Sequence, residues 1–197
     1  MIRKIETMEL RKQISATGFS GIIMLLTILV FPLMISDPPE ALLSGISTLS
    51  SAHPLYSWVV TGSLVLFGIN SIISGWKHFD GLTFQRFMLT TFGCTFTAAA
   101  ISGHLVIYEN FTVGLPFPLV HRYFAGMAVI SFTALATSTA LILSDNRGRM
   151  ISFFSGVAVV FGALIQSESE AYAGLWQRII LVIITGWMIY ISKYSEL

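Results

Sequence analysis

The sequence predicts an all-α, polytopic membrane protein, with six transmembrane helices in one bundle and both termini cytoplasmic. Three observations lead to this prediction. Of the 197 residues, 54% are hydrophobic and only 11% are charged, whereas a soluble domain carries about 25% charged residues. Six apolar runs are long enough to cross a bilayer, which takes roughly 17–25 residues. Nine of the eleven Lys and Arg residues fall on one side of the resulting topology.

The chain is expected to begin with a basic amphipathic tail at 1–15, followed by a six-helix transmembrane domain at 16–197. Within the tail, Ile2, Ile5, Met8 and Ile14 are spaced among charged residues. This spacing suits a short helix lying on anionic lipid. A frayed tail fits the same residues, so both readings stay open. The run that follows is long for a signal peptide and has no small-residue cleavage site after it.

The six crossings are expected at about 16–36, 56–76, 86–108, 119–144, 150–166 and 175–194. Asp37-Pro38-Pro39-Glu40 ends the first, because proline cannot continue a helix. A polar segment at 77–81 follows the second, and the segment 145–149 predicts a tight turn after the fourth. The fifth run is short, so this helix should cross with little tilt.

Basic residues set the expected orientation, because they are retained on the cytoplasmic side of a membrane. The nine that share one side are Arg3, Lys4, Arg11, Lys12, Lys77, Arg86, Arg147, Arg149 and Lys193. The segments 37–55, 109–118 and 167–174 contain no Lys or Arg. Both termini are therefore expected in the cytoplasm.

The two remaining basic residues, Arg122 and Arg178, each fall near the start of a helix on the outer side. A cation at a helix N-terminus opposes both the helix dipole and the orientation rule. An acidic partner or a bound anion has to offset it. Arg122 could pair with Glu109, and Arg178 with Glu168 or Glu170. Either side chain could instead extend to lipid phosphate.

Three of the four histidines map to the same outer side. His53 precedes the second helix, His104 lies about one turn from the end of the third, and His121 lies in the first turn of the fourth. The third and fourth helices are expected to be antiparallel neighbours. At 1.5 Å per residue, the rings of His104 and His121 should lie at similar depth.

Together these residues predict a polar, anion-friendly pocket at the outer leaflet, because ionisable groups at membrane depth indicate function. Helix N-termini and arginines suit a phosphate head group. The expected ligand-binding residues are Arg122, Arg178, His121, His104, Gln177, Glu168 and Glu170. A purely structural role for the same groups is the competing interpretation.

Two kinds of chemistry remain open at this pocket. Hydrolysis would use His104 or His121 as a general base, oriented by Glu109 or Glu168. The catalytic candidates are His104, His121 and Glu109, but no motif supplies a nucleophile or a metal, so the sequence leaves open whether the chain is an enzyme. No cofactor is predicted. A haem or a divalent metal at His104 and His121 is the alternative, although their spacing matches no compact ligand motif.

The third helix carries a semi-polar stripe that includes Thr90, Cys94, Thr97 and His104 at helical spacing, with small residues between them. In membranes such a pattern indicates close helix packing more often than a conduction path. No acidic or basic residue lies near a predicted midplane, which disfavours an ion pump.

Two segments resemble a known family. His121-Arg122 is followed on its helix by Ala125 and Phe132, and Gly174-Leu175-Trp176-Gln177-Arg178-Ile179 opens the last helix, with Trp187 further along it. This layout resembles the "domain of unknown function 998" family of six-helix prokaryotic membrane proteins. The resemblance implies a multi-pass protein of a prokaryotic cytoplasmic (inner) membrane, and it implies no activity.

The leading functional hypothesis is an integral membrane protein that binds or processes a lipid head group or a small anionic ligand at the outer leaflet. The alternative is a non-catalytic accessory subunit that packs against partner membrane proteins. The expected partners are therefore membrane lipids or other integral membrane proteins. Nucleic acid is excluded as a partner, since the sequence has no Lys/Arg tract.

Overall fold

The computed structural model describes residues 18–37, 42–78, 81–107 and 117–193, and every regular element within them is helical. A first helix runs through Gly18–Ile35 and ends in α2 (Phe31–Ile35). The others are α4 (Ile46–Ala52), α5 (Pro54–His78), α6 (Thr83–Ile107), α7 (Phe117–Ile142), α8 (Asn146–Glu168), the 3-10 turn η1 (Glu170–Tyr172) and α9 (Ala173–Lys193). The expected tail at 1–15 lies outside the described residues.

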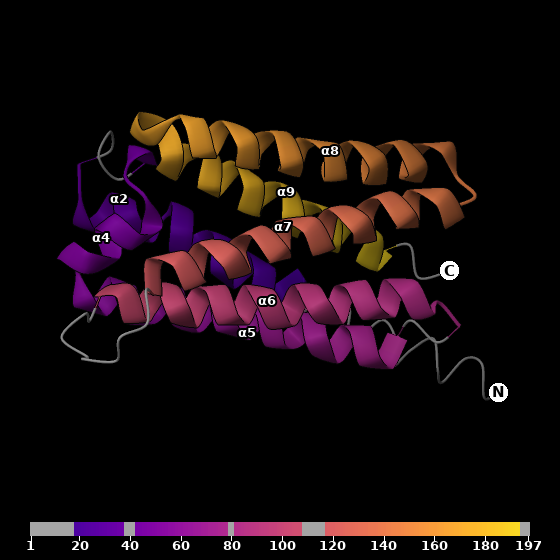
Figure 1. The fold of residues 1–197 in the computed structure, drawn as a ribbon, viewed down its shortest axis with the longest axis horizontal. Helices are drawn as coiled ribbons and strands as arrows, with labels where there is room; N and C mark the ends of the chain where they lie inside the picture. Colours follow the sequence, from indigo (N-terminus) through magenta and orange to yellow (C-terminus); the bar gives the residue numbers. More distant parts are fainter. Residues whose placement is uncertain (1–17, 38–41, 79–80, 108–116, 194–197) are drawn as a thin grey trace.

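The long helices form a ring in which each packs against its neighbour in sequence. Contacts join α5 to α6, α6 to α7, α7 to α8, and α8 to α9. The first helix closes the ring, because Gly21 lies against both Thr185 of α9 and Phe67 of α5. In Figure 1 the first helix and α9 run behind α7, with α8 along one edge and α5 and α6 along the other.

Two ends of this bundle differ. One, called here the α4 end, carries α2, α4 and the first turns of α5, α7 and α9 (Figure 1). The opposite end carries the last turn of α5, the first turn of α6 and the turn between α7 and α8. At that opposite end Arg86 lies over the ring of Trp76, 4.9 Å from its centroid. Nearby, Nε of Arg149 donates to the Leu143 carbonyl at 2.6 Å.

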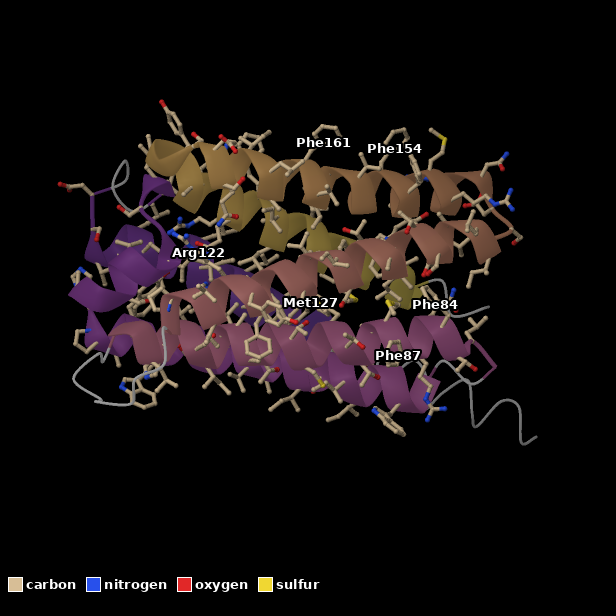
Figure 2. The ribbon with its side chains drawn as sticks, in the orientation of Figure 1. Phe84, Phe87, Arg122, Met127, Phe154 and Phe161 are labelled. Atoms are coloured by element: carbon tan, nitrogen blue, oxygen red, sulfur yellow. The ribbon has the colours of Figure 1, made fainter. Side chains whose placement is uncertain are left out.

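Five of the described helices are long and apolar enough to cross a membrane: Gly18–Ile35, Pro54–Trp76, Pro118–Ile142, Asn146–Glu168 and Ala173–Ile191. Large apolar side chains cover their outer faces, and Figure 2 shows Phe154 and Phe161 projecting from α8 away from the other helices. The fold is thus an all-helical bundle of the multi-pass membrane type. The sixth long helix, α6, has 25 residues, but it is not one of the helices that are both long and apolar enough to cross a membrane.

The helix α8 is longer than the short fifth crossing expected at 150–166. It starts at Asn146 because Asp145 is its N-cap and accepts a hydrogen bond from Gly148 N–H at 2.8 Å. This cap satisfies one of the free amides of the first helical turn. With 23 residues, α8 is about 35 Å long at 1.5 Å per residue. It is therefore long enough to cross a bilayer even when it is tilted.

Three residues of the semi-polar stripe, Thr90, Thr97 and His104, pack against α5, whereas Cys94 is exposed. A Cβ placed on Gly75 would lie 2.7 Å from Oγ1 of Thr90, and one on Gly68 would overlap Oγ1 of Thr97. Glycine is required at both positions because the helix backbones approach so closely there.

Aromatic side chains fill the centre of the helix bundle. Phe67, Phe92 and Phe132 are fully buried, and the Phe132 ring meets Trp187 edge-on at 5.3 Å. The indole N–H of Trp187 donates to Oγ of Ser152 at 3.0 Å, so its one polar atom is satisfied. This packing closes the bundle below the site described next.

Candidate functional site

A cavity of about 170 Å³ lies inside the ring, between the aromatic core and the α4 end. An engineered apolar cavity of about 150 Å³ is large enough to bind benzene. The space therefore admits a small apolar molecule or a short stretch of hydrocarbon chain. Its walls come from α4, α5, α6, α7, α8 and α9.

The cavity is polar at one end and apolar along its walls. The polar lining consists of Ser50, Thr61, His104, His121, Gln166 and Gln177. The apolar lining includes Val60, Leu64, Phe92, Phe96, Ala99, Ala128, Ile180 and Ile184. No Asp, Glu, Lys or Arg is part of the lining in the portion of the chain that the structure describes.

His121 is held by a backbone carbonyl of the neighbouring helix. Its Nδ1 lies 2.8 Å from the oxygen of Ala99 on α6. A carbonyl can only accept, so Nδ1 carries the proton in this contact. Gly103 provides the room, since a Cβ there would lie 3.0 Å from the same nitrogen. The remaining ring nitrogen, Nε2, is then an acceptor when the imidazole is neutral.

His104 is held by hydroxyl groups of α5. Its Nδ1 lies 2.8 Å from Oγ of Ser57 and 3.3 Å from Oγ1 of Thr61. The exposed ring of Trp58 covers the imidazole at 4.4 Å between centroids. His104 and His121 therefore line one cavity, and different neighbours orient their rings.

Gln177, on the first part of α9, reaches α4. Its Oε1 accepts a hydrogen bond from the Ile46 N–H at 3.3 Å. That amide belongs to the first residue of α4, so it has no acceptor within its own helix. Because the oxygen is used in this way, the NH₂ group of Gln177 is left as a donor at the cavity wall.

Arg178 lies one residue further on and has a different environment. Only 1% of its surface is exposed, and four of its hydrogen bonds go to backbone carbonyls. Nε donates to Ile28 at 3.0 Å, while Nη1 contacts Leu42, Ser44 and Gly174 at 2.9 to 3.1 Å. This set of contacts, called here the carbonyl clasp, joins the first helix, the segment before α4 and α9.

Proline explains why one of these carbonyls is available. In a regular helix the oxygen of residue 28 accepts from the N–H of residue 32. Pro32 has no N–H. The Ile28 oxygen would therefore be an unsatisfied acceptor inside the bundle, and the Arg178 guanidinium supplies its donor. Tyr56 of α5 is also fully buried and interacts with the guanidinium.

Arg122 and Glu168, two other expected ligand-binding residues, are not part of the cavity lining. Arg122 is exposed at the α4 end of α7, where Figure 2 labels it, and Glu168 is exposed at the end of α8. Glu170 begins η1. His53, at the end of α4, lines a separate surface hollow with Asp37. The catalytic candidate Glu109 lies outside the described residues.

The serine beside His104 has the spacing of a nucleophile–base pair, which requires a contact of about 2.6–3.2 Å. However, Ser57 is completely buried and is not part of the cavity wall. Its hydroxyl orients the imidazole and does not face a substrate. Across 18–37, 42–78, 81–107 and 117–193, no three His, Cys, Asp or Glu side chains gather as a metal site.

Comparisons with family models, with curated proteins and with solved structures found no match for this chain.

Sequence reasoning missed Ser50, Thr61 and Gln166 of the polar lining, and also Ser57 and Tyr56 beside His104 and Arg178. Gln166 is the only amide on the fifth apolar run, and its position in the last turn of α8 could have marked it. Ser57 and Tyr56 give no such signal, because a serine or tyrosine near a helix end is common at a membrane interface.

Proposed function

We propose that the protein is a multi-pass membrane protein whose central cavity binds a small amphipathic ligand, with the ligand's polar group beside His104, His121 and Gln177. The amphipathic lining of the cavity supports this proposal. Buried polar groups normally have hydrogen-bond partners. At this end of the cavity, hydrogen-bonding capacity is left over next to an apolar chamber that suits a hydrocarbon chain.

All six long helices cross the membrane in this proposal, with the α4 end on the outer side. The charge distribution supports the orientation. Arg86, Arg147 and Arg149 lie at the opposite end, where basic residues indicate the cytoplasm. At the α4 end, the guanidinium of Arg178 is buried and hydrogen-bonded to carbonyl oxygens, so it is not an exposed positive charge at that surface.

A cysteine introduced at Ala52 tests the orientation against one at Asn146, in a Cys94→Ala background because the native Cys94 is exposed. An impermeant thiol reagent on intact cells should label position 52 and leave position 146 unlabelled. The reverse pattern would place the cavity at the cytoplasmic side.

Ligand retention is tested by adding bulk inside the cavity. Ala125 lines the cavity, whereas a side chain on the next residue, Gly126, would meet nothing within 4 Å. Native mass spectrometry should find a small bound amphiphile in the unmodified protein and in Gly126→Phe. The Ala125→Phe variant should remain folded and lose it.

Equal ligand content in all three proteins would contradict binding in the cavity. A stoichiometric protein partner that copurifies in place of a small molecule would support the accessory-subunit alternative.

A further inference from the structure

The hydrogen-bonding groups at the polar end of the cavity select the kind of ligand, and this inference rests on the proposed function. His121 and Gln177 each use one polar atom in a hydrogen bond to the protein backbone. The partner of that bond determines whether the remaining polar atom is a donor or an acceptor, because a carbonyl oxygen can only accept and a backbone N–H can only donate.

The first leftover group is an acceptor. His121 donates from Nδ1 to the Ala99 oxygen at 2.8 Å, which leaves the lone pair of Nε2 in the neutral ring. The ring lines the cavity. A ligand with an O–H or N–H group can donate to it, whereas a group that only accepts cannot.

The second leftover group is a donor. Gln177 accepts at Oε1 from the Ile46 N–H, so its NH₂ group remains, and this residue lines the same cavity. Among the described residues no hydrogen bond from this NH₂ group is found. A ligand oxygen can accept from it.

Charge narrows the choice further. The lining contains no Asp, Glu, Lys or Arg among the described residues, and Arg178 is occupied by the carbonyl clasp. An ionised phosphate or carboxylate lodged here would lose its hydration without gaining a counter-charge, which is costly in an apolar chamber. An ether or a ketone carries no donor and would leave the His121 acceptor unmatched.

We infer that the ligand is an uncharged lipid alcohol: a hydroxyl group that donates to His121 and accepts from Gln177, attached to a hydrocarbon portion in the apolar chamber. One hydroxyl group supplies both the donor that Nε2 of His121 accepts and the acceptor for the NH₂ group of Gln177. The apolar lining, which includes Phe92, Phe96 and Ile184, excludes water from the rest of the ligand.

Three photoreactive probes of equal chain length test this assignment: a diazirine-bearing octanol, its methyl ether and the corresponding octyl phosphate. The protein is held in phosphatidylcholine nanodiscs, and labelled peptides are mapped by mass spectrometry. Octanol should label peptides of α6, α7 and α9 about tenfold more than the other two, since one lost hydrogen bond is worth roughly that factor.

Two variants locate the hydroxyl. Gln177→Glu keeps an oxygen for the Ile46 N–H but removes the NH₂ donor, and His121→Phe removes the acceptor. Each should reduce octanol labelling about tenfold, while Gly126→Ala on the outer face of α7 should leave it unchanged. The two substitutions lie on different helices, α9 and α7. If one variant does not fold, the other still tests the position of the hydroxyl group.

Equal labelling by octanol and its ether, still blocked by Ala125→Phe, would overturn the alcohol assignment and keep the cavity as the binding site. Stronger labelling by octyl phosphate would overturn it in favour of an anionic ligand. Cavity labelling by none of the probes would contradict both this inference and the proposed function. Competition by a diacylglycerol added to the nanodisc would identify the bilayer as the source, and its absence would indicate a free alcohol.

Discussion

Two polar clusters lie next to each other at the α4 end, and adjacent residues of α9 belong to different ones. Arg178 belongs to the carbonyl clasp, where donors and acceptors satisfy one another within the protein. Gln177 belongs to the polar end of the cavity, where its NH₂ group is an unused donor and Nε2 of His121 is an unused acceptor. Buried polar groups that are hydrogen-bonded to one another stabilise the fold, whereas buried groups with an unused donor or acceptor indicate a binding partner outside the protein.

The largest expected effect comes from removing the clasp. Arg178→Met would leave several buried carbonyls without a donor, which costs about 3–5 kcal/mol of unfolding free energy. Arg178→Lys should cost nearly as much, because an ammonium lacks the planar fork that reaches separate carbonyls. Unfolding in mixed micelles, followed by circular dichroism, measures both.

The exposed Arg122 is the matched control, and Arg122→Met should change the unfolding free energy by less than about 0.5 kcal/mol. Similar losses at both arginines would mean that the clasp contributes nothing special.

The second prediction compares the effect of adding one methyl group to each of the two clusters. A Cβ on Gly174 would overlap the backbone of Ser44, which the clasp holds in place. A Cβ on Gly103 would press on the His121 ring at 3.0 Å, and a side chain can turn away.

Gly174→Ala should therefore lower the unfolding free energy by about 1–3 kcal/mol. Gly103→Ala should lower it less and reduce ligand retention instead, as measured by native mass spectrometry. The opposite pattern, with Gly103→Ala the more destabilising and ligand retention unchanged, would remove the distinction between the clusters.

The smallest expected effect concerns Pro32. Pro32→Ala restores an N–H that can donate to the Ile28 oxygen, so that oxygen no longer depends on Arg178. The single variant should change stability little. In the Arg178→Met background it should restore about 1 kcal/mol, which is the net contribution of one hydrogen bond. A double-mutant cycle measures this coupling, and a value of zero would show that the carbonyl is satisfied in some other way.

Most of the fold could be predicted from the sequence because apolar runs and their proline and glycine boundaries are local signals. That His104 and His121 lie at the same end of neighbouring helices also follows from counting residues along the sequence. The start of α8 was missed because its cap, Asp145, was read as part of a turn. The hydrophobic count that placed this helix at 150 gives no weight to a capping residue.

The role of Arg178 was harder to predict. Its position in the sequence suggested an acidic partner or a bound anion, because acidic residues are the only candidate partners for an arginine that can be identified from the sequence. The structure adds backbone carbonyls as partners, and one of them depends on a proline about 150 residues earlier in the chain. A contact between residues so far apart leaves no mark in spacing or composition.

An experimental density map of the protein in nanodiscs made from its native membrane tests the central claim most directly. The account predicts elongated density in the cavity between α6, α7 and α9, ending within hydrogen-bond distance of Nε2 of His121 and the NH₂ group of Gln177. A cavity closed by its own side chains, or empty while ordered lipid covers the outer helix faces, would contradict it.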